Sequence, residues 1–353
     1  MFTSNKIFRF AALMALGSLF FACEEDEPTT RPELQVPDTY TSANFAANTA
    51  TEQVVIEELG SLVSDLNSIE ADGTPAEITY PATLESITLG NYAARINDWL
   101  DEVEKAAGNE FDLENAPAGE GGVLGTRLLD EYGLELEQMI DKGSFGAALY
   151  NHALDVLSDP VTEASVDQLV KTFGTDPTFN PDATRFAATY AKRRSDNEAE
   201  TGYLYDIEDN LITARAAVTA GPEYDPELSA ALSSFLLNWE ESNFATVIFY
   251  ANATKVQIRE AGDDPVALGN AMHAYAEAVG FSAGWKELPN KKITDSEIDQ
   301  ILALLLAEEG QNPESYRFLK EPDLLVNFDQ IIDLIQDVYG FTDAEVADFY
   351  VNG

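Results

Sequence analysis

The spacing of apolar residues predicts α-helix along most of the chain. Between residues 52 and 71, Val55, Leu59, Leu62 and Leu66 recur every three to four positions, as they do on the buried face of a helix. By the same pattern we expect further helices at 84–107, 163–173, 182–194, 203–220 and, in two parts, 228–285. The segment 128–157 is expected to form either one long helix or a pair of helices with the break at Gly143.

Two helices near the carboxyl end begin with a recognisable signal. Thr294 with Glu297, and Thr342 with Glu345, have the spacing of capping boxes. Strand-type alternation is scarce apart from a short extended piece at 40–45. The predicted fold class is therefore all-α. We expect a helical bundle covering 37–353, either single or built from two packed halves, 37–195 and 196–353.

The segment 228–285 is expected to organise this bundle. Its second part, 266–285, contains a single charge, Glu277, although 24% of the whole chain is charged. A helix that is apolar all round is a buried helix. Two other stretches, 144–154 and 242–254, are also nearly free of charge. We therefore expect these three stretches to form the inner helices.

The chain has two histidines, and both lie in these apolar stretches. His273 precedes Glu277 by four residues, so the two side chains share one face of a helix. A buried carboxylate needs a partner, and an ion pair within the core is one interpretation. The other is a metal or ligand site with Glu240 as a third group, since imidazole and carboxylates suit iron, zinc or manganese. His152 joins this site if the inner helices face each other.

The first 36 residues have the pattern of an export signal and a tether. Two basic residues precede the apolar stretch 10–22, which is too short to span a bilayer. The stretch ends at Cys23 and resembles the lipobox of bacterial lipoproteins. The resemblance implies removal of 1–22 and lipidation of Cys23, so that a lipid anchor attaches the protein to a membrane. The alternative is an ordinary signal peptide followed by a chance cysteine.

Acidic residues follow Cys23 directly. Four of them, at 24–27, begin a polar tether that ends near residue 36 and that we expect to be disordered. The cluster resembles the surface-export signal of Bacteroidota lipoproteins, which implies an outer-membrane location facing the cell exterior. The alternative is an acidic linker on the periplasmic face.

Composition excludes several functions. The formal net charge is -43 and no basic patch exists, so neither nucleic acid nor an anionic membrane surface is an expected partner. Cys23 is the only cysteine, which leaves none for a disulfide or a thiolate site. The glycine-rich stretch 115–125 lacks the lysine of a phosphate-binding loop. The motif H-E-x-x-H of zinc peptidases does not occur.

Several motifs in a fixed order carry a family resemblance. They are Val36 to Tyr40, Lys142 to His152, Ala214 to Val218, Trp239 and Glu240, His273 to Phe281, and Lys292 to Asp299. Together they resemble a Bacteroidota lipoprotein family, domain of unknown function 4856, which is distantly imelysin-like. That family carries a motif close to W-D-E-A-F-G-Y, of which the stretch 166–172 keeps only Asp167.

The resemblance implies a helical protein with a histidine–glutamate site. Imelysin-like proteins carry G-x-H-x-x-E, whereas His273 and Glu277 have the spacing H-x-x-x-E. It implies either uptake of iron or another ligand, or metallopeptidase activity.

Our hypothesis is a surface-exposed, lipid-anchored binding protein that captures a metal ion or a small ligand between inner helices. The metal would be a divalent ion, iron or zinc. His273 and Glu277 would contact the ligand, with Glu240 and His152 as further candidates. One alternative is an imelysin-like metallopeptidase in which a carboxylate activates metal-bound water. Another is a structural or accessory lipoprotein without a small-molecule site.

Overall fold

The computed structural model describes residues 31–74 and 76–352. The expected signal 1–22, the lipidation site Cys23 and most of the tether lie outside the described residues. Residues Leu34–Gly353 form one compact unit. The division of this region into halves stays a prediction.

The unit is all-α, as the sequence predicts. Its longer helices are α2 (Ala50–Asp72), α4 (Gly90–Ala106), α5 (Leu136–Ser144), α7 (Glu163–Phe173), α8 (Phe186–Arg193), α9 (Tyr203–Ala220), α10 (Asp225–Ala261), α11 (Pro265–Ala283), α12 (Asp295–Leu304) and α14 (Val326–Tyr339). Its shorter helices are α1 (Phe45–Asn48), α3 (Ala82–Ile87), α6 (Asn151–Val156), α13 (Arg317–Lys320) and α15 (Asp343–Phe349). Two small antiparallel hairpins accompany them, β1 (Gly122–Leu124) with β2 (Arg127–Leu129), and β3 (Ser195–Asp196) with β4 (Thr201–Gly202).

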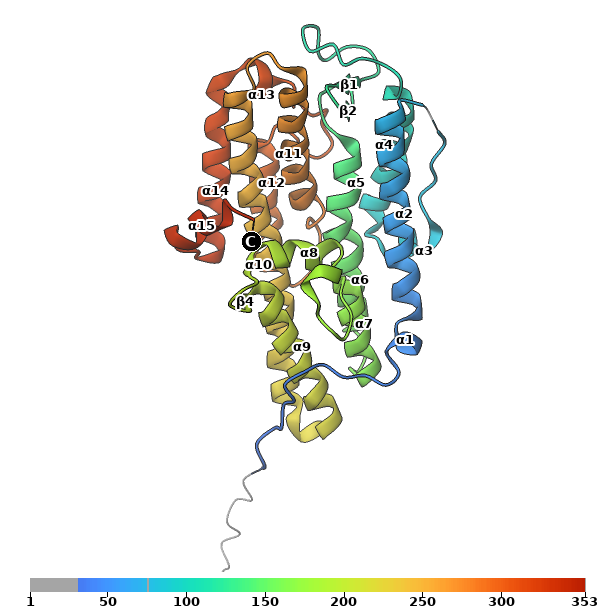
Figure 1. The fold of residues 1–353 in the computed structure, drawn as a ribbon, viewed down its shortest axis with the longest axis vertical. Coiled ribbons are helices and arrows are strands. Elements are labelled where there is room, and N and C mark those ends of the chain that lie inside the picture. Colours follow the sequence, from blue (N-terminus) through green and yellow to red (C-terminus); the bar gives the residue numbers. More distant parts are fainter. Residues whose placement is uncertain (1–30, 75, 353) are drawn as a thin grey trace, which may run out of the picture. The chain divides into compact units, whose positions relative to one another are not determined.

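The longest helix is α10, with 37 residues and a length of about 55 Å at the usual rise per residue. It packs against α9 along its first part and against α11 along its last part, as Figure 1 shows. The predicted pair of helices within 228–285 is confirmed. Asp264 ends the turn between them, because its side chain accepts a hydrogen bond of 3.0 Å from the Val266 N–H and so caps α11.

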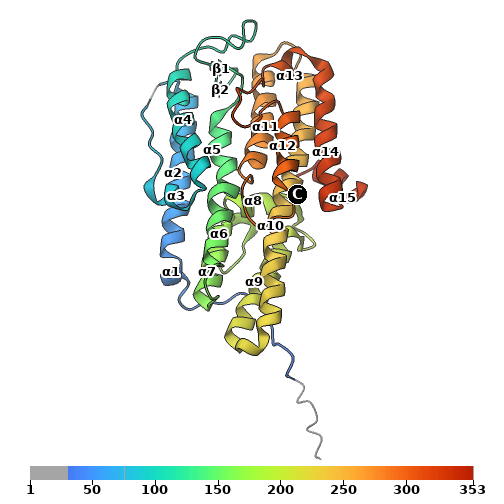
Figure 2. The ribbon, with the colours of Figure 1, turned by 180° about the vertical axis from the view of Figure 1, so that it is seen from behind.

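The central helix is α5, which lies between α2 and α4 on one side and α11 on the other (Figures 1 and 2). The helix expected from residue 128 begins only at Leu136, because residues 127–129 pair with β1 instead. Of the two alternatives for this segment, the continuous helix is confirmed and the break at Gly143 is not. The chain continues through a π-helical turn, Phe145–Tyr150, into α6. Gly143 serves close packing, since a Cβ there would lie 1.5 Å from the Tyr92 hydroxyl oxygen.

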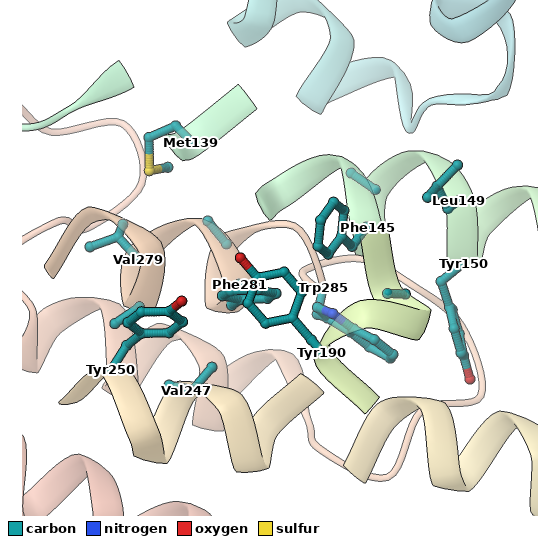
Figure 3. Close-up of a cluster of buried hydrophobic side chains, with 14 of the residues drawn as sticks. Met139, Phe145, Leu149, Tyr150, Tyr190, Val247, Tyr250, Val279, Phe281 and Trp285 are labelled. Atoms are coloured by element: carbon teal, nitrogen blue, oxygen red, sulfur yellow. The ribbon is translucent and has the colours of Figure 1, made fainter. Parts of the chain in front are cut away.

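The expected inner helices are confirmed, and they surround an aromatic core. Figure 3 shows rings from four elements in this core, namely Phe145, Tyr190 of α8, Tyr250 of α10 and Phe281 of α11. The Phe281 ring centroid lies 5.6 Å from that of Phe145, 4.8 Å from that of Tyr190 and 5.9 Å from that of Tyr250. Edge-to-face and offset contacts of this kind are the favourable ones for aromatic rings.

Other boundaries differ locally from the sequence prediction. The segment 84–107 forms two helices, α3 and α4, because the Leu89 N–H between them donates to the Ala147 carbonyl oxygen at 2.8 Å. The stretch 40–45 forms no strand, and α8 begins at Phe186 rather than at residue 182. Both predicted capping boxes are present, at Thr294 and at Thr342.

Asp167 of α7 fastens the segment that follows the tether. Its carboxylate accepts hydrogen bonds from Tyr40 Oη, Ser42 Oγ and Asn48 Nδ2, each at 2.7 Å, and from Arg215 of α9 at 2.8 Å. We call these five residues the Asp167 anchor. Two of the segments that carry the family resemblance, Val36 to Tyr40 and Ala214 to Val218, therefore meet at one carboxylate.

No helix of the part of the chain that the structure describes combines the length and the apolar character required to cross a bilayer.

Candidate functional site

The candidate site lies where α5 meets α11. Every residue of α5 is buried, including Glu137, Asp141 and Lys142, and so is Glu135 just before it. Burial of charged groups is expensive unless they are paired. Lys142 Nζ is bonded to Asp141 and lies 3.4 Å from Glu277 Oε1 on α11. A group of charged side chains thus occupies the interior of the bundle.

His273 is held by a residue that its local sequence does not suggest. Its Nδ1 lies 2.8 Å from Glu135 Oε2, whereas its Nε2 lies 3.7 Å from Glu277 Oε1. Burial lowers the pKa of His273 to about 3, with the positive charges of Arg127 and Lys142 adding to the effect. The ring is therefore neutral at pH 7. When Glu135 is ionised, Nδ1–H donates to it and Nε2 keeps its lone pair.

Glu277 is buried and incompletely bonded. Its Oε1 accepts a 3.4 Å hydrogen bond from Tyr190 Oη, in addition to the contact with Lys142. Its Oε2 has no hydrogen-bond partner within residues 31–74 and 76–352. Burial raises the pKa of Glu277 to about 7, against the lowering effect of Lys142. The carboxyl thus exchanges its proton near neutral pH.

Arg127 of β2 lies at the edge of this group and bridges two carboxyls. Its Nη1 is 3.4 Å from Glu70 Oε1 and 3.7 Å from Glu135 Oε1. Its Nε donates to Asn270 Oδ1 at 3.4 Å. Burial raises the pKa of Glu70 to about 8 and that of Glu135 to about 7. We call the side chains Glu70, Arg127, Glu135, Glu137, Asp141, Lys142, His273 and Glu277 the interior polar cluster.

A pocket of about 480 Å³ opens beside this cluster, between α10 and α11. Residues from one face of each helix line it, at spacings of three to four. Small side chains, Ala253, Ala267 and Ala274, leave the space between the two helices open. The polar lining residues are Arg127, Gln257, Glu260, Asn270, His273 and Glu277, and the aromatic ones are Phe249 and Tyr250. The structure thus brings His273 and Glu277 together in one pocket.

Glu240 lies in a different place from the one expected. Its carboxylate accepts hydrogen bonds from the backbone N–H groups of Lys292 and Ile293, at 2.9 and 2.8 Å, and from Tyr339 Oη at 2.7 Å. None of its partners belongs to the interior polar cluster. Glu240 fixes the segment that leads into α12, and its bonds leave it no part in a site with His273.

His152 also belongs to a separate group of side chains. Its Nε2 lies 3.0 Å from Glu52 Oε1 of α2, and Gln168 Nε2 donates to the same oxygen at 3.1 Å. His152 and His273 share no bonding partner, and the two histidines do not form one site.

The side chains of the interior polar cluster do not fit a metal ion. In the region covered by residues 31–74 and 76–352, no group of three or more His, Cys, Asp or Glu side chains could hold a metal ion. Two cationic groups, Arg127 and Lys142, already lie against the carboxylates closest to His273. These donors do not fit a divalent ion, and they give no support to metal-assisted hydrolysis.

Sequence reasoning missed most of the cluster. Glu135 binds His273 across 138 positions of sequence, and no local spacing could indicate that contact. The stretch from Glu135 to Lys142 carries four charges in eight positions, which is typical of an exposed helix. One observation favoured a role for this stretch beyond that of an exposed helix, because Lys142 and Gly143 belong to the motifs that carry the family resemblance.

Comparison of the chain with protein-family models, with curated proteins and with solved structures finds no match. The resemblance to the Bacteroidota lipoprotein family stays a prediction from the sequence.

Proposed function

We propose that the protein is a lipid-anchored binding protein of the outer-membrane surface that captures a small organic ligand in the pocket between α10 and α11. The observation that carries the proposal is the combination of a 480 Å³ pocket with Glu277, a buried carboxyl that lines it and has an unbonded oxygen within the described chain. Ligand sites are typically concave, partly apolar and equipped with a few convergent polar groups. Anchoring and location rest on the sequence pattern around Cys23.

Of the ligands expected from the sequence, a small organic molecule suits the pocket better than a metal ion. The pocket has aromatic and alanine walls as well as polar groups, whereas the carboxylates near His273 already have cationic neighbours. A neutral imidazole and a carboxyl with a pKa of about 7 can each donate or accept a hydrogen bond. These properties favour a polar organic ligand.

The test is a screen of small polar compounds by ligand-detected NMR, with wild-type protein and the Ala267→Trp variant. Ala267 lines the pocket and makes no polar contact through its side chain, so an indole there fills the space without removing a hydrogen bond. Val266→Trp is the matched control, because Val266 is 46% exposed and does not line the pocket. Compounds that bind wild type and Val266→Trp, but not Ala267→Trp, are the expected result. Binding that is equal in all three proteins would refute the proposal.

A titration with metal ions tests the competing function, which is metal capture. Titration calorimetry with Zn²⁺ and Fe²⁺ on wild type, His273→Ala and Glu277→Gln should give only weak binding that is sensitive to salt and equal in the three proteins, as at any acidic surface. Tight stoichiometric binding that both variants lose would favour metal capture instead, and peptidase assays would then follow.

A further inference from the structure

The pocket between α10 and α11 offers hydrogen-bond acceptors that lack donors. Glu277 Oε2 and Gln257 Oε1 are both buried, both belong to residues that line the pocket, and neither has a hydrogen-bond partner in the described part of the chain. Glu277 is 4% exposed. Unbonded acceptors in a buried site cost free energy that a ligand carrying N–H or O–H groups recovers.

The charges around the pocket favour a cationic ligand. The interior polar cluster and the exposed pocket residue Glu260 together contribute six carboxyl groups, namely Glu70, Glu135, Glu137, Asp141, Glu260 and Glu277. Among the described residues that line the pocket, Arg127 is the one cation, and it is held by Glu70 and Glu135. Lys142 is held by Asp141 and Glu277, and Arg193 of α8 lies over the Tyr190 ring, outside the pocket lining. An anionic ligand would therefore meet more acidic than basic groups, and the cation in the pocket lining already has carboxylate neighbours.

The walls of the pocket favour hydrocarbon next to this charge. Phe249 and Tyr250 lie edge to face with ring centroids 4.9 Å apart, and four alanines line the remaining space. Apolar walls of this kind bury a hydrocarbon group favourably. They suit an organic cation better than a hydrated inorganic one.

We infer that the pocket binds a primary organic amine, whose ammonium group donates to Glu277 Oε2 and Gln257 Oε1 while its hydrocarbon part lies against Phe249 and the alanines. An ammonium carries three donors and no acceptor, which complements a site that has unbonded acceptors. The inference rests on the proposed function, since it names the ligand class of the same pocket.

Ionisation of Glu277 gives the inference a second readout. Burial raises the pKa of its carboxyl to about 7, so an ammonium bound to it favours the ionised form and releases a proton. Affinity should therefore rise between pH 6 and pH 8. The titratable and charged groups that face Glu277 are Glu135, Asp141 and Lys142 from α5 and the residue before it, Tyr190 and Arg193 from α8, and His273 from α11.

The experiment compares three probes with the same hydrocarbon and different head groups, namely phenethylamine, phenethyl alcohol and phenylacetate, by calorimetry on the full chain in mild detergent. The amine should bind at least about tenfold more tightly than the alcohol, because a hydrogen bond to a charged group is worth that factor or more. Phenylacetate should bind weakest. Heats of amine binding should differ between buffers of different ionisation enthalpy, as proton release requires.

Two variants assign the result to the pocket. Glu277→Gln should remove most of the amine's advantage over the alcohol, because the charge that distinguishes the two probes is gone. Ala267→Trp should abolish binding of the amine, whereas Val266→Trp should not. An amine that binds Ala267→Trp as well as wild type is adsorbed on the acidic surface, and the inference is then wrong.

The outcomes also separate this inference from the proposed function. If the three probes bind equally and Ala267→Trp abolishes all of them, the pocket is a ligand site but not an amine site. If none of the probes binds at millimolar concentration, the amine inference is overturned, and the wider screen alone decides the proposed function.

Discussion

Two buried carboxylates, Asp167 and Glu277, are equally hidden from solvent and very differently bonded. Asp167 is 0% exposed and accepts four hydrogen bonds of 2.7 to 2.8 Å, two at each oxygen. Glu277 is 4% exposed, has contacts of 3.4 Å at one oxygen, and has no hydrogen bond at the other within residues 31–74 and 76–352. Burial alone therefore does not distinguish a structural carboxylate from a functional one.

The difference extends to the neighbours of the two carboxylates. The Asp167 anchor ties three side chains of 40–48 to α7 and α9, and every donor in it points at the same group. In the interior polar cluster, Glu70 Oε2 and Asp141 Oδ1 also lack partners among the described residues. Native proteins satisfy nearly all buried polar groups, and exceptions gather at functional sites. We interpret the first group as architecture and the second as a binding site.

Removing the anchoring carboxylate should have the largest effect. Asp167→Ala leaves the buried hydroxyl of Tyr40 without its acceptor and removes the buried partner of the Arg215 charge, so we expect the free energy of unfolding to fall by about 3–5 kcal/mol. Urea denaturation measures the loss. Glu163→Ala is the control, because Glu163 also pairs with Arg215, at 3.1 Å, but is half-exposed. It should cost less than about 1 kcal/mol. Similar losses in the two variants would contradict the assignment.

Removal of a single hydrogen-bond donor should lower stability more at Asp167 than at Glu277. Ser42→Ala removes one 2.7 Å hydrogen bond to Asp167, and we expect it to lower the free energy of unfolding by about 2 kcal/mol. Tyr190→Phe removes a 3.4 Å contact to Glu277, which is too long for a strong hydrogen bond. We expect it to change stability by less than about 0.5 kcal/mol. Chemical denaturation of both variants in parallel provides the comparison, and a larger loss for Tyr190→Phe would reverse it.

The cluster should also make stability depend on pH. In the folded protein the pKa of Glu277 is about 7, whereas the ordinary pKa of a glutamate is 4.5. Between these two pH values the folded protein therefore binds more protons than the unfolded chain. The contribution of Glu277 is complete below pH 4.5 and is lost as pH rises through 7. Between pH 6.5 and 8 the loss is about 1 kcal/mol for this group alone. His273, with its lowered pKa, acts in the opposite direction only below about pH 6.5.

The variant Glu277→Gln isolates this contribution. Glu135 and Glu70 have raised pKa values as well, and so does Asp130 outside the cluster, so wild-type stability should fall more steeply than one group explains. The difference between the urea midpoints measured at pH 6.5 and at pH 8 should be smaller in the variant than in wild type. An unchanged pH slope would mean that Glu277 is ionised throughout this range.

How far the sequence predicted this molecule depends on the range of the contacts. Periodicity identified α2, α7, α9, α10 and α11 because a helix is a local structure with its own repeat. It failed at residue 128, where the chain forms a short hairpin, and it left open whether Gly143 breaks a helix, whereas the missing Cβ of this residue allows close contact with Tyr92. Neither a three-residue strand nor the contact of one glycine with another helix leaves a periodic trace.

The site was predicted in part for the same reason. Spacing placed His273 and Glu277 on one face, and both line the pocket. Spacing also suggested that they pair with each other, whereas His273 bonds to Glu135 and Glu277 approaches Lys142. Glu240 was expected as a third group of the site, whereas its carboxylate accepts hydrogen bonds from the backbone N–H groups of Lys292 and Ile293. The charges on α5 are typical of an exposed helix. A single sequence does not reveal that these charges pair in the interior.

A small effect on stability should come from a residue with a large effect on binding. Glu277→Gln keeps the shape of the side chain and removes a charge that is poorly compensated, while Lys142 keeps its bond to Asp141. We expect the free energy of unfolding at pH 7 to change by less than about 1 kcal/mol in either direction, because a buried charge that lacks good hydrogen bonds contributes little net stability. The preference of the pocket for an amine should be lost in the same variant. Thermal and urea denaturation, run beside Asp167→Asn, test the first expectation. If Glu277→Gln unfolds as readily as Asp167→Asn, then Glu277 stabilises the core as Asp167 does, and its unbonded oxygen is no guide to function.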